Sequence, residues 1–170
     1  RVVVETAEAC GLHLLPPAAR DPLQTTTAGV GILLREAAAA LPAPDAELVI
    51  GLGGSATVDA GAGMAMALGW RLLDAEGEEI LPFGSGLLRL DRMVPPDDAP
   101  LPARLRVLAD VTTPLLGLHG AARVFGPQKG ASPRDVPVLE RALARWADVT
   151  ARDVGLDVRH LEGAGAAGGL

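Results

Sequence analysis

Short apolar runs separated by glycine and proline recur along the chain, and their spacing predicts alternating helices and strands. Residues 2–9 are predicted to be a short helix that stops near Gly11. The alanine-rich stretch 32–40 ("ILLREAAAA") is predicted to be a helix that ends before Pro42, with the threonines at 25–27 as candidate caps. The continuous apolar run 46–52 ("AELVIGL") predicts a buried central strand, and the alternating run 104–111 ("RLRVLADV") predicts a second strand.

The remaining pattern completes an α/β fold. We expect a helix of small residues over 63–70, a β-hairpin over 70–81, and a loop over 82–102 with a short helix near its centre. After a loop with a short helix, the clearest helix is predicted from Ser132 as N-cap and Pro133 at the first position, with Leu139 and Leu143 on its apolar face. We therefore predict a mixed, partly parallel sheet with flanking helices.

Composition and charge limit the classes of function that the chain can have. The chain has 170 residues, 49% of them hydrophobic, so one domain with a substantial core is expected. A net charge of −6 and 2% aromatic residues argue against nucleic-acid binding. No run approaches the roughly 18 apolar residues of a membrane helix. The single Cys10 excludes an internal disulfide and suits the cytoplasm. We expect an excerpt of a longer protein, because the chain begins without Met and ends in "GAGAAGGL".

The stretch 51–69 ("GLGGSATVDAGAGMAMALG") is the first candidate site, because a glycine loop between a strand and a helix can bind an anion with its backbone N–H groups. Close packing of the helix on the sheet is the alternative explanation for the glycines. The hydroxyls of Ser55 and Thr57 can donate to phosphate oxygens. Asp59 could hold Mg²⁺ or orient a substrate hydroxyl, and helix capping is its equally supported alternative.

Two further residues carry candidate chemistry. Asp110 ends a predicted strand, where ligands gather in open α/β sheets, although an Asx-type turn would also explain it. Lys129, the only lysine beside 14 arginines, lies next to Gln128 in a glycine loop and could bring a positive charge to a phosphate or carboxylate. A solvated surface charge is the alternative for Lys129. The closing "GAGAAGGL" would by itself suit a linker, and the three histidines suit structural positions.

Four segments of the chain resemble, in sequence order, the signature segments of bacterial glycerate kinases of the glycolate-pathway type. They are "DPLQTTTAGVG", the stretch 51–69, "ADVTTPLLGLHGAARVFGPQKGA" and "GAGAAGGL". The resemblance covers essentially the whole chain. It implies ATP- and Mg²⁺-dependent phosphorylation of D-glycerate, with 2-phosphoglycerate the favoured product. It also implies two α/β domains with a cleft between them, residues 1–170 being mostly the inserted middle domain with both flanking parts missing.

Under this resemblance, we expect Asp59, Asp110 and Lys129 to be catalytic, with either aspartate as the Mg²⁺ ligand. The expected substrate- and phosphate-binding residues are Gly53, Gly54, Ser55, Thr57, Thr112 and Gln128.

The chain departs from the family pattern at three places. Val58 and Ala60 flank Asp59 where the family reads Asn-Asp-Gly, Thr113 replaces an asparagine, and Ala28 replaces a common tyrosine. These departures, together with the missing flanks, leave a second hypothesis open. In it, the chain is a non-catalytic α/β domain that binds an anion or a nucleotide.

Overall fold

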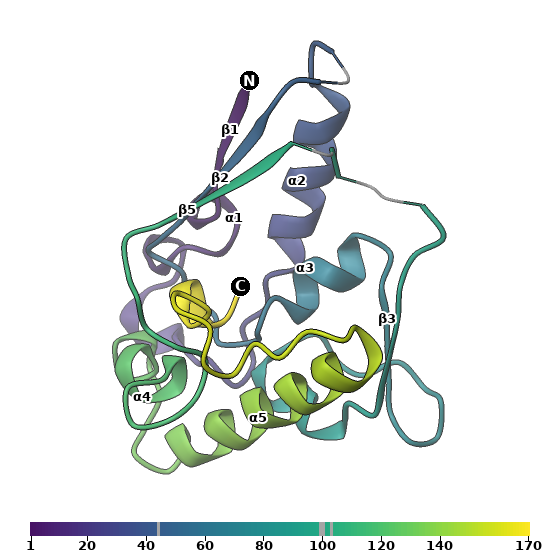
Figure 1. Cartoon of the computed structure of the whole chain (residues 1–170). Helices are drawn as coiled ribbons and strands as arrows, with labels where there is room; N and C mark the ends of the chain where they lie inside the picture. The colour runs from purple at the N-terminus through teal and green to yellow at the C-terminus, as the bar shows by residue number, and fades with distance from the viewer. Residues whose placement is uncertain (44, 99–100, 103) are drawn as a thin grey trace.

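A three-stranded parallel sheet and the helix beside it form the first part of the fold (Figure 1). The computed structural model describes residues 1–43, 45–98, 101–102 and 104–170. Strand β2 (Leu48–Leu52) lies in the middle, between β1 (Val2–Glu5) and β5 (Leu105–Ala109). Helix α2 (Ala28–Ala39) packs Val30 and Leu34 against Val4, Leu48 and Ile50 of the sheet. These aliphatic side chains form the smaller of two cores.

The larger core surrounds the amphipathic helix α5 (Val136–Asp153), which crosses the lower part of the molecule in Figure 1. Leu139 and Leu143 are fully buried on its apolar face, as the helical spacing predicts. The elements in or beside this core are α3 (Ala62–Ala67), the antiparallel pair β3 (Arg71–Leu73) and β4 (Arg92–Val94), the 3-10 helix Gly84–Arg89, and α4 (Ala121–Phe125). The α/β prediction is confirmed, with the parallel and antiparallel strands in separate sheets.

Several predicted elements need correction. The helix predicted over 2–9 is wrong: β1 comes first, and α1 (Ala7–Cys10) is a single turn. Burial explains this, because "VVVE" pairs along β2 and puts Val4 into the core. The predicted hairpin turn is present, since the Ile80 N–H bonds the Leu72 carbonyl, but the strand ladder of β3 runs to β4 instead. Helix α5 begins at Val136, after a turn at Ser132–Asp135.

Strand β5 is exposed along its whole length, including 51% for Val107 and 52% for Leu108. It is an edge strand of the parallel sheet, and its outer side has no strand partner among the described residues. Parallel sheets are usually covered on both faces, so this exposure is unusual.

Among the described residues, no helix combines the length and the apolar character that crossing a membrane requires.

Candidate active site

The parallel sheet brings the glycine loop and Asp110 together. Leu52, the last residue of β2, is paired in register with Ala109, the last residue of β5. The next residues, Gly53 and Asp110, therefore leave the sheet side by side at the carboxyl ends of the strands. Ligands of open α/β sheets bind at this edge. The sequence-based prediction for these two positions follows directly from the strand assignment.

The glycines of the loop serve two different purposes. A Cβ at Gly63 would lie 2.5 Å from the Ala28 backbone nitrogen, so this glycine allows close packing, whereas a Cβ at Gly51 would meet only the mobile end of the Glu5 side chain. A Cβ at Gly53 would meet nothing within 4 Å, and Gly54 has φ +60° with only a 3.7 Å neighbour. Packing therefore does not explain Gly53, and Gly54 is required by its left-handed conformation. Both glycines are exposed, with their backbone open to a ligand.

Lys129 lies behind this loop and not on the surface, so the solvated-charge alternative is wrong. It is 2% exposed, and its Nζ donates to the Ser55 hydroxyl at 2.8 Å and to the Thr57 carbonyl at 2.7 Å. Burial lowers the pKa of Lys129 to about 8, against a smaller opposing effect of Cys10 and Asp59. An ammonium has three N–H donors, so one remains beyond these two bonds.

These residues surround a hollow of about 150 Å³. It contains six of the nine predicted site residues: Gly53, Gly54, Ser55, Asp110, Gln128 and Lys129. They come from the loops after β2 and β5 and from the 3-10 helix Pro127–Lys129 after α4. The hollow thus combines open backbone, one buried cation and one exposed carboxylate, which suits an anion such as a phosphate.

Asp59 lies outside the hollow and is completely buried. Its Oδ2 accepts from the backbone N–H and the hydroxyl of Thr27, both at 2.8 Å, and from the Gly63 N–H at 3.3 Å. Its Oδ1 accepts from the Gly61 N–H at 3.3 Å. Burial raises the pKa of Asp59, and these donors oppose that shift. The geometry is that of the capping alternative, because the carboxylate joins the start of α2 to the first turn of α3.

Thr57 and Thr112 also lie outside the hollow. Thr57 is buried and faces a separate cavity on the other side of the loop, while Thr112 is exposed beyond the end of β5. The three histidines, at positions 13, 119 and 160, are exposed and lie outside the hollow.

The closing glycine segment completes the hollow and is not a linker. Ala166 and Ala167 line it, and the Ser55 hydroxyl donates to the Ala167 carbonyl at 2.9 Å. Gly168 packs so tightly on the Thr57 carbonyl that no Cβ would fit there. Sequence reasoning counted "GAGAAGGL" among the signature segments but named none of its residues as part of the site. It also missed Phe125, whose ring centre lies 5.9 Å from the Lys129 Nζ.

The donor set for a divalent cation is sparse. Among the described residues, no group of three or more His, Cys, Asp or Glu side chains is placed to hold a metal ion. Mg²⁺, however, commonly uses one or two carboxylates and completes its shell with water and phosphate oxygens. Asp110 fits that pattern as an exposed carboxylate in the hollow. Asp59 does not fit, because four hydrogen bonds already occupy its oxygens.

The chain is similar in sequence to known proteins. The family model described as "Glycerate kinase family" matches residues 1–170. The chain is 49% identical to a glycerate kinase of Bacillus subtilis, over 99% of this chain and 44% of the relative. It is 46% identical to a glycerate 2-kinase of Escherichia coli, over 98% of this chain and 44% of the relative.

A solved structure gives the same result for the fold. A protein of Salmonella typhimurium LT2, provisionally named glycerate kinase 2, superposes with a TM-score of 0.91 at 47% identity. The match covers 99% of this chain and 45% of that one. The chain therefore spans less than half the length of the relatives that it matches.

Proposed function

We propose, on the premise that this chain belongs to the glycerate kinase family, that it forms part of an enzyme that phosphorylates D-glycerate from ATP. The family supports glycerate as the small-molecule substrate and a nucleotide as the phosphoryl donor. The observation that carries the proposal is the hollow at the strand ends, where the open glycines, Lys129 and Asp110 meet. A cytoplasmic location remains a prediction.

The roles follow from the positions. The exposed backbone at Gly53 and Gly54 and the third N–H of Lys129 bind phosphate oxygens or the glycerate carboxylate. Ser55 fixes Lys129 at 2.8 Å and the closing segment at 2.9 Å, so it positions the wall. Phosphoryl transfer depends mainly on such positioning and on charge neutralisation.

Asp110 has one of two roles, either metal ligand or proton acceptor. In transfer, the glycerate hydroxyl oxygen bonds to the γ-phosphorus, the bond from that phosphorus to the ADP oxygen breaks, and the hydroxyl proton leaves. Two observations, that Asp110 lines the hollow and that it is exposed, support it as the acceptor of this proton; in the alternative in which Asp110 holds Mg²⁺, the proton passes to water. When bound, Mg²⁺ supplies charge neutralisation at the nucleotide phosphates. We propose phosphorylation at the 2-hydroxyl, in line with the relative named glycerate 2-kinase.

The rest of the catalytic cleft is proposed to come from sequence beyond this chain. We propose that residues 1–170 are mostly the inserted middle domain of a two-domain enzyme. Two observations support this: the chain spans less than half of its relatives, and the exposed β5 leaves apolar residues such as Val107 and Leu108 uncovered.

The test is a coupled assay of ADP release with D-glycerate, using the protein at the length of its relatives. We expect Mg²⁺-dependent turnover, with the phosphorylated carbon identified by ³¹P and ¹³C NMR. Lys129→Ala and Asp110→Asn should each lower kcat/KM at least tenfold, or about 1.4 kcal/mol. The matched surface controls Arg123→Ala and Asp97→Asn should stay within threefold. Phosphate binding without turnover would favour the non-catalytic hypothesis.

A further inference from the structure

Two alanines have a left-handed backbone, which is unusual for a residue other than glycine. Among the described residues, only Ala60 with φ 52° and Ala167 with φ 50° are non-glycine residues with positive φ. The conformation is unfavourable because it brings the Cβ close to a backbone oxygen. The two alanines lie on either side of one contact, in which the Ala60 N–H donates to the Gly168 carbonyl at 3.2 Å. Strained backbone of this kind is often found where a protein holds a ligand.

The closing glycine segment, yellow in Figure 1, joins two loops that border the hollow. The Gly165 N–H donates to the Thr113 carbonyl, in the loop after β5, at 2.8 Å. Two residues further on, the Ala167 carbonyl accepts from the Ser55 hydroxyl, in the loop after β2, at 2.9 Å. The position of one loop relative to the other therefore depends on this segment.

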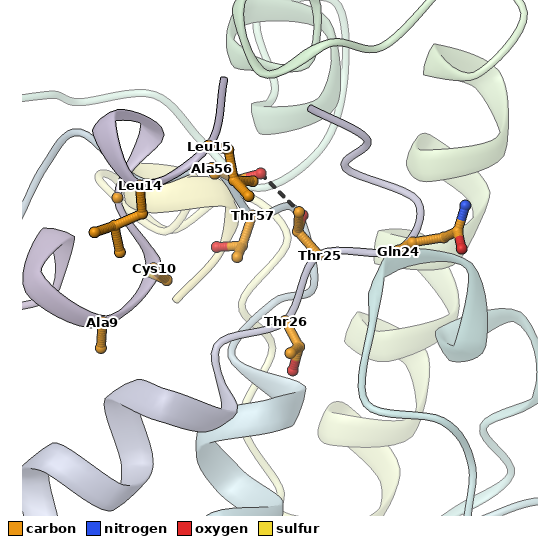
Figure 2. Close-up of a pocket in the computed structure, with 10 residues that line it drawn as sticks. Ala9, Cys10, Leu14, Leu15, Gln24, Thr25, Thr26, Ala56 and Thr57 are labelled. Carbon is orange, nitrogen blue, oxygen red and sulfur yellow. Dashed lines mark hydrogen bonds between the residues drawn. The ribbon is translucent and has the colours of Figure 1, made fainter. Parts of the chain in front are cut away.

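The bond to the Ala167 carbonyl continues to Lys129. The Lys129 Nζ donates to the Ser55 Oγ at 2.8 Å, and Ser55 gives its own hydrogen to Ala167. A serine hydroxyl has a single hydrogen, so the Ala167 carbonyl decides which way the Ser55 lone pairs face. The other acceptor of Lys129 is the Thr57 carbonyl at 2.7 Å. The Thr57 side chain lies on the other side of the loop, beside Cys10 (Figure 2), so only its backbone faces Lys129.

The left-handed backbone of Ala167 makes this contact possible. Residues Ala167, Gly168 and Gly169 form a run with φ values of 50°, 86° and 95°. A right-handed φ at Ala167 would differ by about 110° and would turn the carbonyl and the two glycines away from their present neighbours. Gly168 packs on the Thr57 carbonyl without room for a Cβ, so the glycines cannot be replaced there. Contacts on both sides thus hold the one alanine of this run in a strained conformation.

We propose that Ala167 is a positioning residue of the anion site. Its left-handed backbone directs its carbonyl at Ser55, and Ser55 in turn orients the Lys129 ammonium towards the hollow. This role rests on the proposed binding of an anion by Lys129. The Ala167 side chain is a methyl group without a polar atom, so the residue acts through its carbonyl.

The experiment is a double-mutant cycle of Ser55→Ala, Ala167→Val and the double variant, in the protein at the length of its relatives. The dissociation constants of inorganic phosphate and D-glycerate are measured by ligand-observed NMR, and Lys129→Ala shows which anion depends on the hollow. Valine is branched at Cβ and disfavours the left-handed conformation. Each single variant should weaken binding of that anion at least tenfold. The double variant should bind within threefold of the weaker single variant, because both changes remove the same link.

Two further variants are matched controls. Ala167→Gly should retain binding within threefold, because glycine keeps the carbonyl and adopts positive φ readily. Ala18→Val makes the same change as Ala167→Val in the 3-10 helix Pro17–Ala19, where Ala18 is exposed, and should also stay within threefold.

The cycle separates a failure of this role from a failure of the anion site. If neither anion depends on Lys129, the anion site and the role of Ala167 are both overturned. If Lys129→Ala weakens binding but the two single effects multiply to about a hundredfold in the double variant, only the role of Ala167 is overturned. Unchanged binding in Ala167→Val would also overturn it. If Ala167→Val does not fold, Ser55→Ala decides: binding weakened at least tenfold supports the role, and unchanged binding overturns it.

Discussion

Replacing Lys129 by methionine should change how the stability of the chain depends on pH. Lys129 is 2% exposed and its pKa is about 8, compared with 10.5 for an unperturbed lysine. The two acceptors found, the Ser55 hydroxyl and the Thr57 carbonyl, match the two N–H groups of a neutral amine. The third proton of the ammonium adds charge without a further bond. Burial disfavours the charged ammonium, so the folded chain releases this proton more readily than the unfolded chain does.

The size of the effect follows from the two pKa values. Between pH 8 and 10.5 the unfolded chain holds more protons than the folded one, so stability rises with pH in this window. Integrating the difference from pH 7 to pH 10 gives a gain of about 2.5 kcal/mol in the free energy of unfolding. Methionine does not titrate, so the variant lacks this contribution.

The assay is urea unfolding of both proteins at half-unit steps from pH 7 to pH 10. The quantity of interest is the unfolding free energy of the unaltered protein minus that of Lys129→Met. It should rise by about 2.5 kcal/mol over the range, whatever its value at pH 7. A difference that stays constant within about 0.5 kcal/mol would show that Lys129 titrates as a solvated lysine, and the account of the buried amine would be wrong.

Three further changes test the residues around the hollow. Asp59→Ala should lower the unfolding free energy by at least about 3 kcal/mol, because it leaves buried donors without an acceptor. Asp59→Asn should lower it by less, because an amide oxygen can keep the two 2.8 Å bonds from Thr27. Equal losses in urea titrations would contradict this. The free energy of unfolding should be at least about 1 kcal/mol higher for Ala60→Gly than for the helical control Ala65→Gly, because Ala60 has φ 52°. A lower Tm for Ala60→Gly than for Ala65→Gly would show that the backbone at Ala60 is not strained. Asp110→Asn should leave Tm within about 2 °C of the parent, because Asp110 is exposed. A larger fall in Tm would show that the Asp110 carboxylate stabilises the fold.

Much of the site could be predicted because it depends on strand ends. The apolar runs of β2 and β5 are visible in the sequence, and the residues that follow two parallel neighbours must meet at one edge. Gly53 and Asp110 follow from this alone. The unusual use of one lysine pointed to Lys129. Its burial could not be predicted, because it depends on α4 and the closing glycines folding back over the loop.

What the sequence left open or mispredicted also has physical causes. A carboxylate in a glycine loop has the same sequence signal whether it faces a ligand or the helix behind it, so Asp59 could not be assigned. Its partner Thr27 is 32 positions away. The run "VVVE" is too short for its period to separate helix from strand, and pairing with β2 decides its conformation. At Ala60, the glycine of the family pattern now has a reason, since the backbone there is left-handed.

Lys129 also makes the hollow directly observable. Because it is the only lysine in the sequence, biosynthetic incorporation of ¹³C,¹⁵N-lysine would produce a single side-chain Cε–Nζ resonance. In the folded chain that resonance would come from within the hollow, with no other side-chain amine to overlap it. Its chemical shift would follow the charge of the nitrogen and the arrival of an anion. The chain thus carries its own spectroscopic probe at the position where we propose that phosphate binds.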